Sequence, residues 1–129
     1  MRVDSIMFVK HPTKIILLGL IFAITDSIYL SSVSNHFNKL LMNIQGSPIS
    51  LKPVETVLAY VALVFSLYYF IIREKKSILD AGLLGWSIYA IYEFTNAAIF
   101  KKWGWTTIII DTLWGGILYM ITTYIYYKF

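Results

Sequence analysis

Apolar side chains dominate four long stretches of this chain, and only a few polar residues interrupt each one. The stretches cover about 15–33, 54–72, 78–100 and 106–127. A helix needs about 20 predominantly apolar residues to cross the hydrocarbon core of a bilayer, and each stretch comes close to or exceeds that length. The pattern therefore predicts an all-α integral membrane four-helix bundle, formed by a single domain over residues 1–129.

The connections between the stretches predict how the helices are arranged. The charged turn 73–76 and the Lys- and Trp-containing turn 101–105 are short, so the helices on either side of each turn should run antiparallel. In the longer connection, apolar residues recur with helical spacing and polar residues occupy the opposite side, which predicts a short amphipathic helix over about 36–45 in the membrane interface. Residues 6–9 form a second candidate of this kind on the opposite side.

Composition supports lipid as the surrounding solvent. Hydrophobic residues make up 58% of the chain and charged residues 14%, whereas a soluble domain carries about 25% charged residues. The basic residues lie at the ends of the apolar stretches, where membrane proteins contact lipid headgroups, so the net charge of +4 does not indicate nucleic-acid binding. We expect the lipid bilayer as the partner, and the sequence predicts no cofactor.

The distribution of Lys and Arg predicts the orientation in the membrane. Seven of these residues lie in the two terminal tails and the turn 73–76, and the remaining four lie on the other side. Because cytoplasmic loops carry an excess of Lys and Arg, both termini should face the cytoplasm.

Acidic residues inside the apolar stretches give the strongest functional signal. Asp26, Glu93 and Asp111 each lie about five to seven residues from the same side of the membrane. With a rise of about 1.5 Å per residue, the three acids share one level in the outer half of the bilayer. A carboxylate at mid-bilayer costs roughly 2.5–3.5 kcal/mol, so such a residue normally has a partner or a function. We therefore expect the three acids to converge in the bundle core.

Helical spacing adds neighbours to the acids and defines a candidate binding site. Its residues are Asp26, Tyr29, Tyr89, Tyr92, Glu93, Thr95, Asn96, Asp111, Trp114 and Gly115. Glycines in the third and fourth stretches would let those two helices approach closely. Trp103 and Trp105 are interpreted as interfacial anchors. No catalytic residue is predicted, and no metal site, because His11 and His36 lie outside the stretches on opposite sides.

Three motifs in the second half of the chain resemble a known family. Tyr-Glu-Phe-Thr-Asn-Ala-Ala at 92–98, the following Trp103, and Asp-Thr-Leu-Trp-Gly at 111–115 are similar to domain-of-unknown-function family 2177. That family comprises small predicted four-span membrane proteins of bacteria and large DNA viruses. Asp26 matches the acid of its first span, and Glu93 stands where the family has Asp. The resemblance implies the topology and the polar cluster without an activity, and it leaves open a bacterial membrane or an internal membrane of a virus.

Three functions are compatible with these features. The first is binding or transport of a small solute, a cation or a proton, for which an aqueous path would require a homo-oligomer. The second is a structural or assembly role in a cellular or viral membrane, with the acids serving helix packing. The third, ranked last, is an intramembrane enzyme that acts on lipid and uses one of the acids as acid or base. Enzymatic activity is disfavoured because no activated nucleophile or metal-ligand set stands out.

Overall fold

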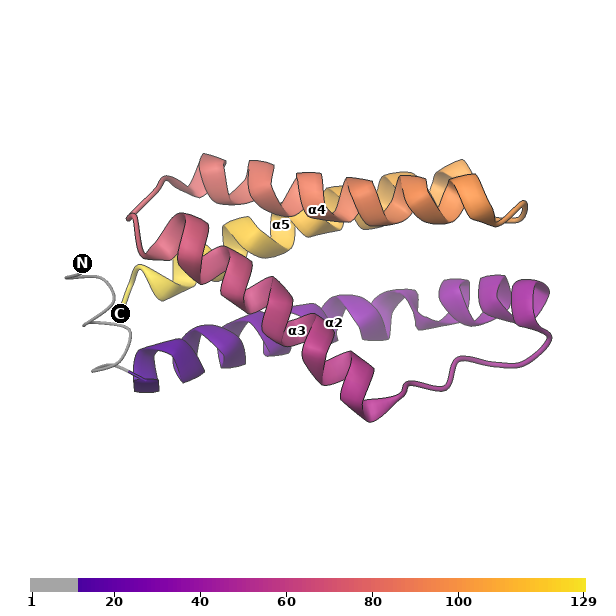
Figure 1. Cartoon of the computed structure of the whole chain (residues 1–129), viewed down its shortest axis with the longest axis horizontal. Helices are drawn as coiled ribbons and strands as arrows, with labels where there is room; N and C mark the ends of the chain where they lie inside the picture. Colours follow the sequence, from indigo (N-terminus) through magenta and orange to yellow (C-terminus); the bar gives the residue numbers. More distant parts are fainter. Residues whose placement is uncertain (1–11) are drawn as a thin grey trace.

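The computed structural model describes residues 12–129 and contains helices only, with no strand among these residues. The helices are α2 (Pro12–Gln45), α3 (Pro53–Leu67) with its π-helical continuation η1 (Tyr68–Ile72), α4 (Ile78–Ile99) and α5 (Trp105–Tyr126). They form an elongated bundle (Figure 1). The C-terminus and the α3–α4 turn lie at one end, here called the terminal end, and the α4–α5 turn lies at the other, the distal end. The predicted all-α bundle is confirmed, and residues 6–9 lie outside the described part.

Among residues 12–129, three helices are long and apolar enough to cross a membrane. They are Thr13–Gln45, Pro53–Ile72 and Trp105–Tyr126. Large apolar side chains cover the outside of the bundle, among them Leu58 and Ile91, which are 60% and 69% exposed. α4 is 22 residues long but more polar, and it does not meet the same criterion. A fourth crossing stays a prediction, which the antiparallel packing of α4 along α5 supports (Figure 1).

α4 and α5 pack closely because glycines lie where their backbones meet. A Cβ atom added at Gly85 would lie 2.2 Å from the carbonyl oxygen of Gly115, and one added at Gly115 would lie 2.3 Å from Cγ of Tyr89. Any side chain at these positions would force the helices apart, in keeping with the close approach that the sequence predicts.

α2 continues well past the first predicted span. The segment 36–45 is helical, as predicted, but it is continuous with α2 and does not form a separate helix; its place in the membrane interface stays a prediction. No glycine or proline interrupts this part of α2, and Leu40 packs against Trp103 and Ile108 at the distal end. The apolar side of the segment therefore packs against the distal end of the bundle. Because α2 runs past the start of α3, the chain needs the extended connection 46–52 to return (Figure 1).

α3 is attached to the bundle by its C-terminal end and by tyrosine hydroxyl groups. Leu67 is the buried residue of α3, and η1 adds Ile71 and Ile72 to the core. The hydroxyl of Tyr119, on α5, donates to the carbonyl of Leu63 at 3.0 Å. The remaining length of α3 is largely exposed, so it contributes less to the core than α4 and α5 do.

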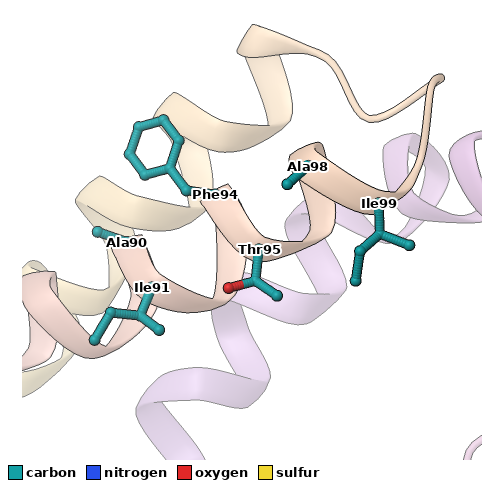
Figure 2. Close-up of a pocket in the computed structure, with 6 residues that line it drawn as sticks. All are labelled: Ala90, Ile91, Phe94, Thr95, Ala98 and Ile99. Atoms are coloured by element: carbon teal, nitrogen blue, oxygen red, sulfur yellow. The ribbon is translucent and has the colours of Figure 1, made fainter.

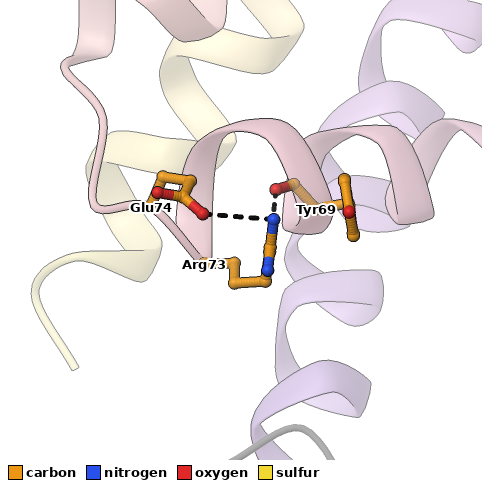
Figure 3. Close-up of polar contacts among 3 residues, drawn as sticks. All are labelled: Tyr69, Arg73 and Glu74. Carbon is orange, nitrogen blue, oxygen red and sulfur yellow. Dashed lines mark hydrogen bonds and ion pairs between the residues drawn. The ribbon is translucent and has the colours of Figure 1, made fainter. Parts of the chain in front are cut away.

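Charged side chains mark the α3–α4 turn at the terminal end. The Nε atom of Arg73 donates to the carbonyl of Tyr69 at 3.3 Å, and its guanidinium lies 3.1 Å from Oε2 of Glu74 (Figure 3). The same guanidinium lies 4.0 Å from the centre of the Tyr69 ring. Ser77 then caps α4 by accepting the N–H of Asp80 at 3.0 Å. Such a turn suits the membrane–water interface, where charged and aromatic side chains gather.

Candidate functional site

Three polar contacts join α2 to α5 and form what we call the polar ladder. From the distal end inward, they pair His36 with Thr107, Tyr29 with Asp111, and Asp26 with Trp114. Because the two helices run antiparallel, residue numbers fall along α2 while they rise along α5. The contacting residues therefore follow one face of each helix, and the ladder is a product of helical spacing.

Asp26 has a hydrogen-bond donor for each of its carboxylate oxygens. The indole N–H of Trp114 donates to Oδ1 at 2.9 Å, and the hydroxyl of Tyr60 donates to Oδ2. The side chain is 6% exposed. Asp26 thus connects α2 to α3 and α5, and its partners are neutral groups. A buried carboxylate with both oxygens hydrogen-bonded avoids much of the desolvation penalty of an isolated one.

Glu93 is fully buried, and its two oxygens have different surroundings. Oε1 accepts the indole N–H of Trp103 at 2.7 Å. Oε2 receives no hydrogen bond from a donor among the described residues. The side chain interacts with the carboxyl group of Asp111, which itself accepts the hydroxyl of Tyr29 at 3.0 Å. Two carboxylate oxygens are both acceptors, so a hydrogen bond between them requires a proton on one of them.

Aromatic rings enclose the three acids. Tyr29 stacks on Trp114 with ring centroids 4.6 Å apart and an interplanar angle of 4°. The hydroxyl of Tyr29 donates to Asp111 and interacts electrostatically with Asp26 and Glu93, so all three acids lie near this hydroxyl. Asp26 pairs with Trp114 and Asp111 with Tyr29, which places Asp26 about one helical turn nearer the terminal end than Asp111.

The structure brings most, but not all, of the candidate residues together. Tyr89 packs against Gly115 beside the acids. Tyr92 is 56% exposed. Thr95 is also exposed, and together with Phe94 it lines a shallow apolar pocket on the outside of α4 (Figure 2). These two candidates, Tyr92 and Thr95, point away from the cluster. Asn96 is half-buried, one turn beyond Glu93 towards the distal end.

Two hydrogen-bond donors to the acids, Trp103 and Tyr60, were not among the candidate site residues, and neither were His36 and Thr107 of the polar ladder. Trp103 was interpreted as an interfacial anchor, but it is 8% exposed and donates to Glu93. Tyr60 was not considered, although it lies seven residues from Pro53, the first residue of α3, at a depth similar to that of the acids. Its position at the level of the acids is the sequence signal that marks Tyr60 as a hydrogen-bond donor to them. For Trp103, the sequence signal was its place among the motifs shared with the family.

The apolar helices and the buried acids of this bundle define an integral membrane protein with a polar core. The chain belongs to the family described as predicted membrane protein DUF2177, whose model matches residues 12–127. The resemblance seen in the sequence motifs is thereby confirmed. Neither the curated proteins nor the solved structures compared with this chain gave a match.

Proposed function

We propose that this membrane protein binds a proton between Glu93 and Asp111 and exchanges it in proton transfer through the membrane. The observation that carries the proposal is the fully buried Oε2 atom of Glu93, which has no donor within residues 12–129 and belongs to a side chain that interacts with Asp111. A proton shared by the two carboxyl groups would give both a hydrogen bond. It would also remove one negative charge from a region of low dielectric constant, where an unpaired charge is expensive.

Charge and size favour a proton over a larger ligand. The donors around the acids are the neutral groups of Tyr29, Tyr60, Trp103 and Trp114, and each points at a carboxylate oxygen. A solute or metal ion at the pair would have to displace these contacts. A proton needs only the space between the neighbouring carboxyl groups of Glu93 and Asp111. The geometry therefore supports the smallest of the ligands considered from the sequence.

The polar ladder offers a route for proton exchange at the distal end. His36 is exposed, and its Nε2 atom lies 2.7 Å from the hydroxyl of Thr107. Thr107 is 3% exposed and lies four residues, about one helical turn, before Asp111. An imidazole exchanges protons readily near neutral pH. In our proposal, His36 takes up a proton from water, and the hydroxyl group of Thr107 transfers it towards the carboxyl groups of Glu93 and Asp111.

Proton entry into liposomes tests the proposal. Purified protein is reconstituted with a pH-sensitive dye inside the liposomes, and a potassium diffusion potential drives protons inward. We expect proton entry above that of empty liposomes with the wild type, and its loss when Glu93→Gln and Asp111→Asn are combined. Asp80→Asn, the same chemical change at an exposed acid in the first turn of α4, should leave the flux unchanged. Wild-type flux equal to that of empty liposomes, or unchanged flux in the double variant, would refute the proposal.

A second candidate is a packing role, and Asp26 is the observation that favours it. Both of its oxygens are hydrogen-bonded, and they hold α3 and α5 against α2. If packing is its role, Tyr60→Phe should lower the free energy of unfolding by about 1 kcal/mol, because one hydrogen bond is lost. Tyr92→Phe removes a hydroxyl from an exposed tyrosine and serves as the control. Equal stability of the two variants would count against a packing role for Asp26.

A further inference from the structure

A groove of about 500 Å³ lies between α2 and α3 and is lined by neither Asp26, Glu93 nor Asp111. This volume falls within the range of small-ligand sites, roughly 300–1,000 Å³. The lining is almost entirely apolar and includes Ile15, Gly19, Ala23, Tyr60, Val64 and Tyr68. Since it lies between two apolar helices that can each cross a membrane, its surroundings are lipid chains.

Small residues on α2 leave this groove open. A Cβ atom added at Gly19 would meet nothing within 4 Å, in contrast to the glycines between α4 and α5. Ala23 lies one turn further along the same face of α2 and also lines the groove. The space is therefore free of protein atoms next to Gly19, and a flexible hydrocarbon chain could occupy it without moving either helix.

The length of the groove matches one leaflet of a bilayer. Its lining on α2 extends from Ile15, at the terminal end, to Ala23, which corresponds to roughly 12 Å at about 1.5 Å per residue. Half of a hydrocarbon core of about 30 Å is about 15 Å. An extended acyl chain from a single leaflet would thus lie along most of the groove.

Basic side chains lie at the end of the groove that opens towards the terminal end. Lys14 immediately precedes Ile15 of the lining, and Lys75 and Lys76 follow η1 in the α3–α4 turn. All three lysines are exposed. Basic residues next to the end of a membrane helix attract anionic lipid headgroups. The charge at this end therefore complements an anionic phospholipid better than a zwitterionic one.

We propose that the groove binds an acyl chain of an anionic phospholipid from the leaflet at the terminal end, with its headgroup beside Lys14. The bound chain would pack against Tyr60, whose hydroxyl donates to Asp26. Lipid binding would in this way restrain a residue that also contacts the acid cluster. The proposal does not depend on proton binding by Glu93 and Asp111.

Native mass spectrometry of protein released from nanodiscs tests this site. The nanodiscs contain equimolar phosphatidylglycerol and phosphatidylcholine. We expect the wild type to retain lipid enriched in phosphatidylglycerol, and Gly19→Leu or Ala23→Leu to lose it because the new side chain fills the groove. Ala62→Leu adds a similar apolar group at an exposed position of α3 outside the lining and should retain the lipid. Lys14→Gln should weaken the preference for phosphatidylglycerol about fivefold, which corresponds to about 1 kcal/mol per basic residue.

Three results would overturn the proposal. The first is a wild-type protein released without lipid. The second is equal lipid retention by wild type and by both groove-filling variants. The third is a dimer that Gly19→Leu dissociates, because a second copy of the chain would then occupy the groove. Circular dichroism of each variant shows whether its helices form, and Ala23→Leu keeps the test valid if Gly19→Leu does not fold.

Discussion

Replacing Trp103 by Phe tests whether the aromatic N–H donor holds Glu93 in the core. Phe keeps most of the apolar contact with Leu40 and Ile108 but lacks the indole N–H that lies 2.7 Å from Oε1 of Glu93. Oε1 of Glu93 would then lose its indole donor, in a side chain with no solvent exposure. A buried polar group that loses its hydrogen bond costs about 1–3 kcal/mol. We expect Trp103→Phe to lower the free energy of unfolding by that amount.

The same substitution at Trp105 is a matched control. Trp105 belongs to the same end of the bundle but is 67% exposed, so Trp105→Phe should change the free energy of unfolding by less than about 0.5 kcal/mol. The assay is unfolding by added SDS of protein in bicelles, followed by circular dichroism. Repeating Trp103→Phe in a Glu93→Met background separates packing from hydrogen bonding, since the acceptor is then absent. The reasoning fails if the two Trp variants are equally stable, or if the cost of Trp103→Phe is the same in both backgrounds.

Two further predictions concern the same bundle. Glu93→Gln should change the free energy of unfolding by less than about 0.5 kcal/mol, because its amide can donate where the shared proton would lie. Glu93→Met lacks such a donor and should lower the free energy of unfolding by about 1–3 kcal/mol. SDS unfolding compares the two variants, and equal costs would contradict the shared hydrogen bond. Gly85→Ala should cost about 1–3 kcal/mol, because its Cβ would lie 2.2 Å from a carbonyl oxygen. Gly19→Ala meets open space and should be neutral or stabilising by up to about 1 kcal/mol; a reversed order in thermal unfolding would refute the close packing of α4 and α5.

Much of the fold follows from long apolar runs and charged turns. The helix that begins at Pro53 and continues through η1 to Ile72 matches the predicted stretch 54–72 within one residue, and α5 is equally close to 106–127. The segment 36–45 shows the limit of this reasoning. An apolar stripe identifies which side of a helix is buried but not which part of the protein or membrane buries it. Here the stripe packs against Trp103 in the α4–α5 turn.

The acids of the site were predictable because burying a charged side chain is energetically costly, so a charged residue within an apolar stretch stands out. Asp26, Glu93 and Asp111 stood out because each interrupts an apolar stretch at a similar depth, and all three are buried. Tyr92 was included for its position beside Glu93, but adjacent helical residues point about 100° apart, and it faces outward. Donors such as Tyr60 resemble ordinary interfacial tyrosines in a sequence. Only the packing of the helices determines which aromatic hydroxyl or indole reaches an acid.

Infrared spectroscopy of the reconstituted protein at neutral pH tests most directly whether Glu93 and Asp111 share a proton. A protonated carboxyl group has a carbonyl stretching band that is separate from the bands of carboxylates. We predict such a band in the wild type, its loss in Glu93→Gln, and no change in Asp80→Asn. The absence of this band from the wild type, or its persistence in Glu93→Gln, would contradict the shared proton.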